Sequence, residues 1–289
     1  MRISTLIIFF AGTAVAAGAQ SSISLVPKYP PGGTLYYSIA IHSTIGAKAT
    51  LDTTAEAAIT ILPGAAPGRF DAQARFTKYT TAVQAGPDDL AALQKQSSDT
   101  DQAATTMGAS RFRMAAGQFT LVARPNGPQY DQPVEMLEEL VRTDALPAVP
   151  VAVGEHWTRT RARAIPTLNF SVPLTLECAL TEMAPVNGVP AATVTVHTTG
   201  RTPLPPGSLP GSQELASQGV LAEATVGFDT TATDHYRLAD AVLLESSSEN
   251  HNSMQIKLVG PSPQAGTTNT NIDSTSTVKL ERIEASKGH

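Results

Sequence analysis

Apolar and polar residues alternate along much of this chain, and the alternation predicts β-strands. In residues 70–77 every second residue is apolar, so these side chains would share one face of an extended strand. Residues 55–61 show a similar alternation, and the Pro- and Gly-rich segment 63–68 separates the two runs. Two alternating runs around such a turn predict an antiparallel hairpin with one face in contact with water.

Further runs of this kind predict a large sheet. Asn187-Gly188 is a turn pair that favours a two-residue hairpin. The other expected strands cover residues 34–42, 158–164, 172–182, 192–198, 220–229, 235–247, 252–259 and 272–283. This spacing corresponds to about ten to twelve strands. We therefore predict a mainly β fold with a large antiparallel sheet, arranged as a half-barrel or a sandwich.

Two segments carry the signals of a helix instead. One begins at Pro87, where the missing N–H of proline does no harm and two acidic residues complement the helix dipole. This helix either continues to about Met107 or ends after Gln96. The second covers residues 131–142, which have an apolar stripe at helical spacing. We expect both helices to pack on the sheet.

The chain divides into four segments. Residues 1–20 combine Arg2, an apolar run and small residues near the end, which is the pattern of a secretory signal peptide. The other segments are a β-rich N-terminal half with two helices (21–150), a β-rich C-terminal half (151–284) and a flexible tail (285–289). Two structurally similar halves are one interpretation, and the general self-similarity of antiparallel β proteins is the other. Within the second half, the Pro- and Gly-rich segment 200–212 is expected to be an extended linker.

A short string of residues lies where the two halves meet. Leu146-Pro147 precedes Pro150-Val151-Ala152-Val153-Gly154-Glu155-His156-Trp157, which follows the second helix and leads into a strand. The string resembles that of an exported bacterial β-rich domain family of unknown function, in which a Pro-Val-x-Val-Gly-Glu-x-Trp motif joins two halves. The resemblance implies an exported, β-rich, non-catalytic protein and supplies no catalytic residues. Trp157, the only tryptophan, is expected to anchor the core at this junction.

Composition and charge narrow the classes of function. Only 16% of the 289 residues are charged, the formal net charge is −5, and Lys and Arg form no cluster. Nucleic-acid binding is therefore not expected, because phosphate contacts need concentrated positive charge. Cys178 is the only cysteine, and its place in an alternating run predicts a buried small hydrophobe rather than a reactive thiolate. Once a signal peptide is removed, we expect no stable membrane span.

No pattern in the sequence predicts catalytic chemistry. The six histidines show no metal-ligand spacing, and we interpret His235 and His251 as exposed residues on strand edges. Glu135, Glu138 and Glu139 lie on one predicted helix, where we expect them to form its water-facing side and not a pair of glycosidase carboxylates. Nucleophile-elbow and nucleotide-binding motifs are absent from the sequence. We therefore assign no catalytic, cofactor-binding or metal-ligating residue, and no cofactor.

Three functional hypotheses are compatible with this chain. The first, which we favour, is an exported, non-catalytic protein of the cell envelope, periplasmic or extracellular, that binds an apolar or lipid-like ligand inside a half-barrel. The second is a structural module that interacts with another envelope protein. The third is a hydrolase whose site is assembled from residues distant in the sequence. The expected partner is thus an apolar small molecule or an envelope protein.

Overall fold

The structure is a computed structural model. It describes residues 22–46, 48–64, 66–67, 69–115, 118–125, 130–165, 170–209, 211–260 and 267–284. The predicted signal peptide (1–20) and the predicted flexible tail (285–289) lie outside the described residues.

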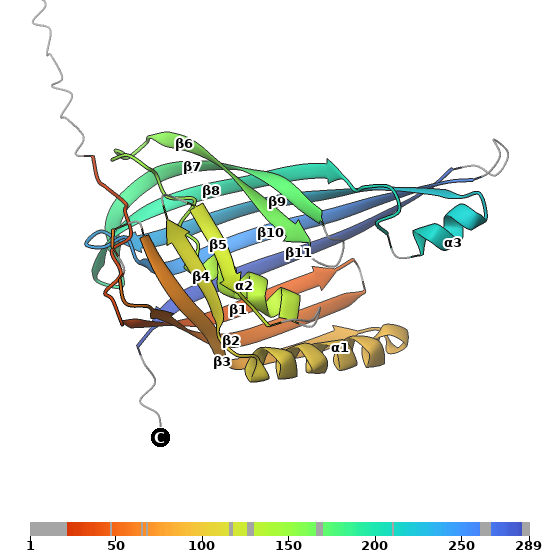
Figure 1. Cartoon of the computed structure of the whole chain (residues 1–289), viewed down its shortest axis with the longest axis horizontal. Helices are drawn as coiled ribbons and strands as arrows, with labels where there is room; N and C mark the ends of the chain where they lie inside the picture. The colour runs from red at the N-terminus through yellow and green to blue at the C-terminus, as the bar shows by residue number, and fades with distance from the viewer. Residues whose placement is uncertain are drawn as a thin grey trace, which may run out of the picture.

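Eleven strands form a single antiparallel sheet that does not close on itself (Figure 1). The strands are β1 (Thr34–Ile45), β2 (Ala49–Ile61), β3 (Arg69–Ala85), β4 (Ser110–Ala115), β5 (Gln118–Ala123), β6 (His156–Ile165), β7 (Phe170–Val186), β8 (Val189–Pro203), β9 (Leu221–Arg237), β10 (Leu243–Val259) and β11 (Thr267–Ile283). Their order across the sheet is β5-β4-β3-β2-β1-β11-β10-β9-β8-β7-β6. The prediction of a mainly β fold with one large antiparallel sheet is confirmed.

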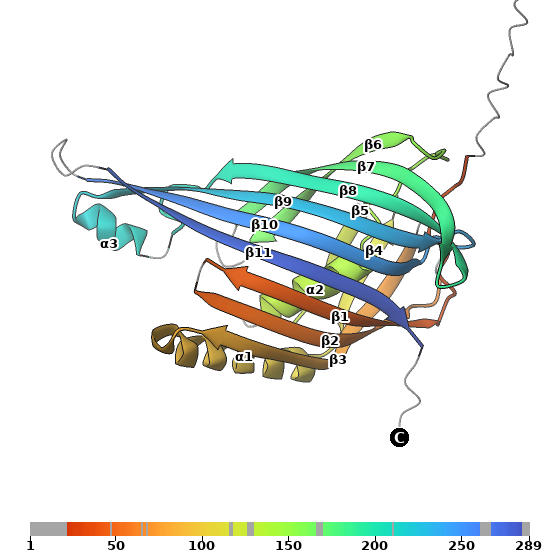
Figure 2. The same cartoon turned by 180° about the vertical axis from the view of Figure 1, so that it is seen from behind.

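Both halves of the chain contribute to this one sheet. Strands β1 to β5 form one side and strands β6 to β11 form the other, each side following the chain from strand to neighbouring strand. The two sides meet where β1 pairs with β11, from Tyr36 opposite Ile283 to Ile45 opposite Ser274 (Figure 2). The sheet curves, and its concave side faces α2 (Figure 1).

Three helices accompany the sheet: α1 (Pro87–Thr106), α2 (Asp131–Val141) and α3 (Ser212–Ser217). The longer alternative for the first predicted helix is the observed one. Strand β4 pairs only with residues 69–74 of β3, and α1 lies along the remainder of β3 (Figure 2). There the carboxylate of Asp101 accepts a hydrogen bond from the backbone N–H of Thr81 at 2.9 Å. Helix α1 thus covers the part of the β3 edge that would otherwise present unpaired backbone groups.

The predicted hairpin at Asn187-Gly188 is confirmed. It joins β7 to β8, and both residues have positive φ, 50° for Asn187 and 80° for Gly188. A two-residue turn of this type matches the right-handed twist of the flanking strands. Cys178, in β7, is buried as predicted, and burial raises the pKa of its thiol to about 12.

Three predictions about element boundaries were wrong. Residues 235–247 are not a strand but the end of β9, a turn and the start of β10. In this turn Asp240 accepts hydrogen bonds from the Arg237 guanidinium and from the backbone N–H of Val242, which holds the chain in a reversal. The edge strand β5 and its neighbour β4 were not predicted at all.

The third error concerns the expected linker at 200–212. Its first four residues belong to β8, and Ser212 begins α3. A Cβ atom at Gly200 would lie 2.7 Å from the carbonyl oxygen of Pro173, so glycine is needed for this close strand contact. A glycine that signals a loop in the sequence therefore serves packing between β7 and β8.

The hydrophobic core fills one end of the concave side. Helix α2 contributes Val134, Leu137, Leu140 and Val141, each at most 4% exposed. Trp157 is half-buried at the edge of this core, and its Nε1–H donates a hydrogen bond to the carbonyl oxygen of Ala145 at 2.7 Å. This bond ties the segment that connects α2 to β6 onto the sheet.

Candidate ligand-binding cavity

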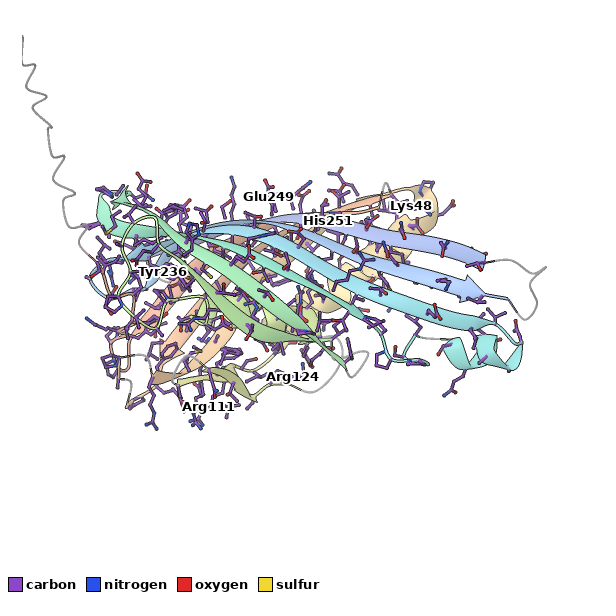
Figure 3. The ribbon with its side chains drawn as sticks, turned by 90° about the horizontal axis from the view of Figure 1, so that it is seen from above. Lys48, Arg111, Arg124, Tyr236, Glu249 and His251 are labelled. Carbon is purple, nitrogen blue, oxygen red and sulfur yellow. The ribbon has the colours of Figure 1, made fainter. Side chains whose placement is uncertain are left out.

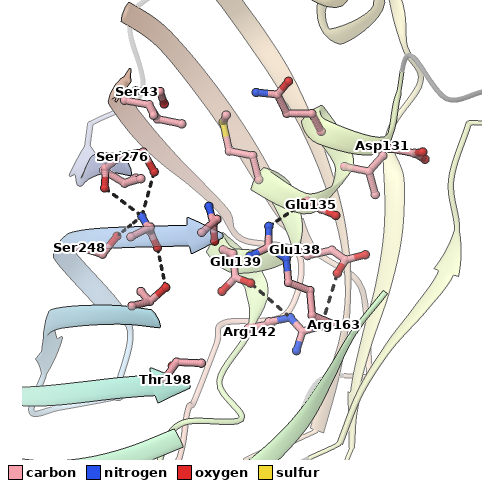
Figure 4. A pocket seen from close by; sticks show the side chains of 18 of the residues that line it. Ser43, Asp131, Glu135, Glu138, Glu139, Arg142, Arg163, Thr198, Ser248 and Ser276 are labelled. Atoms are coloured by element: carbon pink, nitrogen blue, oxygen red, sulfur yellow. Dashed lines mark hydrogen bonds and ion pairs between the residues drawn. The ribbon is translucent and has the colours of Figure 1, made fainter. Parts of the chain in front are cut away.

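The other part of the concave side encloses a cavity of about 990 Å³ (Figure 4). Its floor is the sheet, from β3 through β2, β1, β11, β10, β9 and β8 to β7, and residues of α1, α2 and β6 line its sides. A hollow this large arises because the side chains of this region do not meet those of the helices. Small-molecule sites usually have volumes of about 300–1,000 Å³, so the cavity is at the upper end of that range.

A row of neutral polar side chains crosses the floor. The strand register aligns one residue from each of five adjacent strands: Ser43, Ser276, Asn250, Thr230 and Thr198. All five line the cavity. We call this row the polar belt.

Asn250 is the central residue of the polar belt. Its amide oxygen accepts a hydrogen bond from the Thr230 hydroxyl at 2.9 Å, and its Nδ2 lies 3.3 Å from the hydroxyl oxygen of Ser276. Nδ2 also lies 3.4 Å from the hydroxyl oxygen of Ser248, and Figure 4 shows these groups together on the floor. The bonds fix the orientation of the amide and leave the other hydroxyl groups of the belt able to contact a ligand.

Charged residues of α2 and β6 lie opposite the belt. Glu135 accepts a hydrogen bond from Arg163 at 3.1 Å, and Glu139 accepts one from Arg161 at 3.2 Å. Directly after α2, the Arg142 guanidinium donates to Glu138 at 3.4 Å. Figure 4 shows this network along the side of the cavity. The prediction that the glutamates form a plain water-facing side of the helix was therefore wrong, because the arginines of β6 bring them into a cavity.

Burial and pairing act in opposite directions on these carboxylates. Burial raises the pKa of Glu135 and of Glu138, and the nearby Arg163 and Arg142 reduce the rise without cancelling it. For Glu139 burial also acts to raise the pKa, but Arg161 and Arg142 outweigh it and the pKa lies below its usual value. The Glu139 side chain is nevertheless 55% exposed, since it borders the open space of the cavity.

Asp234 is a deeper carboxylate on the floor, in β9. Its carboxylate accepts hydrogen bonds from the Ser246 hydroxyl at 2.6 Å and from the Tyr236 hydroxyl at 3.2 Å. In the register its other neighbour is Val194, which is fully buried. Burial raises the pKa of Asp234, and the hydrogen bonds from Ser246 and Tyr236 reduce this rise without cancelling it.

Aliphatic side chains line the rest of the cavity. They come from the floor and from α1 and include Ile41, Ile45, Leu51, Leu93 and Ile272. Ile45 and Ile272 are 40% and 48% exposed, values that are high for large apolar residues facing the inside of a sheet. The cavity thus presents apolar and polar surfaces side by side.

The histidines are placed elsewhere. No histidine or cysteine is among the residues that line this cavity in the described part of the chain. Figure 3 shows His251 on the outer face of the sheet, and His197, on the same face, lies 3.0 Å from Asp229. His235 and His251 are not on strand edges as predicted, because β9 and β10 are inner strands.

The described ranges contain no group of three or more His, Cys, Asp or Glu residues placed to hold a metal ion. Among the helices of those ranges, none is long and apolar enough to cross a membrane. No known family model matches the chain, and no curated protein is significantly similar to it.

Proposed function

We propose that this chain is an exported, non-catalytic binding protein of the cell envelope whose ligand is a lipid-like molecule with a polar head. The observation that carries the proposal is the cavity of about 990 Å³ on the concave side of the sheet. The signal-peptide pattern of residues 1–20 supports the exported location. The resemblance of the 150–157 string to an exported, non-catalytic family is part of the same proposal.

The lining favours a molecule with two kinds of surface. An aliphatic chain fits beside Ile41, Leu51 and Ile272, and each methylene group removed from water there contributes about 0.8 kcal/mol to binding. A polar head fits against the polar belt, whose hydroxyl and amide groups would be poorly solvated beside a purely apolar ligand. The two surfaces together therefore support an amphipathic ligand over a plain hydrocarbon.

The arrangement of the charged groups supports binding over hydrolysis. The α2 carboxylates are paired with arginines, and Ser246 donates to Asp234, while no histidine of the described residues lines the cavity. A serine nucleophile is normally activated by an adjacent base that a third group orients. Hydrolysis therefore has less support from this geometry than retention of an unmodified ligand.

Filling the cavity tests the proposal. Ala232 lies on the floor between the polar belt and Asp234, and Thr231 is its neighbour on the outer face of β9. We expect Ala232→Trp to reduce the affinity for a fluorescent apolar probe at least tenfold, while Thr231→Trp leaves the affinity unchanged. Native mass spectrometry of protein purified without detergent is expected to show a co-purified small molecule. Equal binding of the probe by the two variants would contradict a ligand inside the cavity. So would a failure of the two variants and of the unaltered protein to bind the probe at all.

A further inference from the structure

The charges that line the cavity do not balance. Six carboxylates face four arginines, which leaves an excess of two negative charges when all groups are ionised. The carboxylates are Asp131, Glu135, Glu138, Glu139, Asp144 and Asp234, and the arginines are Arg124, Arg142, Arg161 and Arg163. A confined space with this imbalance attracts cations and repels anions.

The arginines are already engaged. Arg124 lies 2.9 Å from Asp131, Arg142 lies 2.8 Å from Asp144, and the two β6 arginines pair with α2 glutamates as described above. An anionic ligand would have to displace one of these carboxylates. Asp234, by contrast, has only hydroxyl donors and no positive partner in the described part of the chain.

Asp234 occupies a position that is unfavourable without a counter-ion. Its row on the sheet contains Ser246, which donates to it, and otherwise Ile39, Leu280, Val194 and Leu180, all at most 8% exposed. Across the cavity the negative charge of Glu139 raises the pKa of Asp234 further, so the two carboxylates repel each other. A cation between them would relieve both the desolvation of Asp234 and this repulsion.

Three further polar atoms on the lining lack a hydrogen-bond partner among the described residues. One is Nε of Arg142, which lies 4.0 Å from Glu139, and the other two are oxygens. The hydroxyl group of Tyr79, on a side chain that is 4% exposed, has no hydrogen-bond partner among the described residues. The same is true of the Asn252 Oδ1 atom, one step along β10 from the polar belt. Both oxygens can accept a hydrogen bond from a polar group of a ligand. Asn252 lies six residues along β10 from Ser246, the neighbour of Asp234, so this group is not the one that pairs with Asp234. Buried polar atoms without a partner are rare in folded proteins, so the two oxygens support a ligand with polar groups in the cavity.

We propose that the ligand is an amphipathic amine, whose ammonium group lies between Asp234 and the α2 carboxylates and whose aliphatic chain lies along Ile41, Leu51 and Ile272. This inference rests on the proposed function and names the chemistry of the head group. The polar belt then surrounds the neutral part of the head.

Three probes with the same ten-carbon chain test the charge preference: decylammonium, decanol and decanoate, each titrated by calorimetry below its aggregation concentration. We expect decylammonium to bind at least tenfold more tightly than decanol, and decanoate to bind most weakly. Binding of decanoate or decanol as tight as that of decylammonium overturns the inference and leaves the proposed function standing. Binding of none of the three contradicts the proposed function itself.

Substitutions on the two faces of β9 test the position of the ammonium group. Asp234→Asn removes the inner carboxylate with little change in size, and we expect it to reduce decylammonium affinity about 30-fold while leaving decanol affinity within twofold. Asp229→Asn, on the outer face of the same strand, is the matched control and should leave both affinities unchanged. Equal decylammonium binding by both variants overturns the assignment.

A second variant keeps the position of the ammonium group testable if Asp234→Asn does not fold. Glu139→Gln alters a carboxylate that is 55% exposed, so the fold should be retained. We expect this variant to reduce decylammonium affinity about threefold and to reduce the preference over decanol by the same factor. If Asp234→Asn does not fold, an unchanged preference in Glu139→Gln overturns the placement of the ammonium group.

Discussion

The two ends of the concave face are built from the same strands and differ in what fills them. At the core end β1 and β11 point Ile39 and Leu280 inward, and both side chains are buried. Four residues along each strand, at the cavity end, the inward residues are Ser43 and Ser276. The backbone pairing is continuous through both regions. The two ends thus differ in the side chains at these positions and not in the backbone pairing.

This difference shows what alternation along a strand does and does not determine. A period of two decides which side chains point to the same face. It does not decide whether that face meets a packed helix, as around Leu137, or bounds a hollow, as around Asn250. Close packing of the first region provides stability, and imperfect packing of the second leaves space for a ligand.

The largest expected effect comes from a matched pair of truncations on β1. Ile39→Ala removes a core side chain that is 1% exposed and should destabilise the protein by about 2–5 kcal/mol. Ser43→Ala, at the cavity end of the same strand, should change the free energy of unfolding by less than about 0.5 kcal/mol. Urea denaturation followed by circular dichroism measures both. Similar losses for the two variants would show that the cavity end is as tightly packed as the core end.

A smaller effect is expected within the polar belt. Asn250→Ala removes the amide that bonds Thr230 and lies beside Ser276, and the loss should be about 1–2 kcal/mol. Thr277→Ala, on the outer face of β11, is the control, and its effect on stability should be close to zero. The same denaturation measurement applies. A belt that contributes no stability would give identical midpoints for both variants.

The sheet was predictable from the sequence because most strands keep a clean alternation. The polar belt was not, because polar residues occupy both faces of the strands that form it. Residues 247–253 and 273–277 contain no large apolar side chain at all, so neither face is marked as the inner one. Only the register with Ile39 and Leu280, further along the strands, shows which of these residues point into the cavity.

The charged side of the cavity could not be predicted from the sequence for a different reason. Three glutamates on one helix indicate a water-facing side, and two arginines at alternate positions of a strand, Arg161 and Arg163, indicate a charged strand face. Each pattern by itself is ordinary. Their meeting depends on the connection that returns the chain from α2 to β6, held by Trp157 and Ala145, and no local pattern encodes that contact.

The third test compares single carboxylates on the two faces of the sheet, and it has the smallest expected effect. Hydrogen bonds from Arg113 hold the pKa of Asp71, in β3, below its usual value of 3.8, whereas burial raises the pKa of Asp234 above the same value. The contribution of Asp71 to stability is therefore present above pH 3.8 and is lost as the pH falls through its lower folded-state pKa. The contribution of Asp234 is present below pH 3.8 and is lost as the pH rises through its higher folded-state pKa.

Substitution by asparagine removes each titration separately. The free energy of unfolding of the unaltered protein, minus that of the variant, should fall with rising pH for Asp234→Asn and rise with pH for Asp71→Asn. The Asp71 effect is the smaller one, because its partner Arg113 is half exposed and solvent screens the pair. Urea denaturation between pH 3 and 7 measures both slopes. Slopes of the same sign would mean that Asp234 has a positive partner in the protein itself. The carboxylates on the two faces of the sheet would then not differ in how they respond to pH.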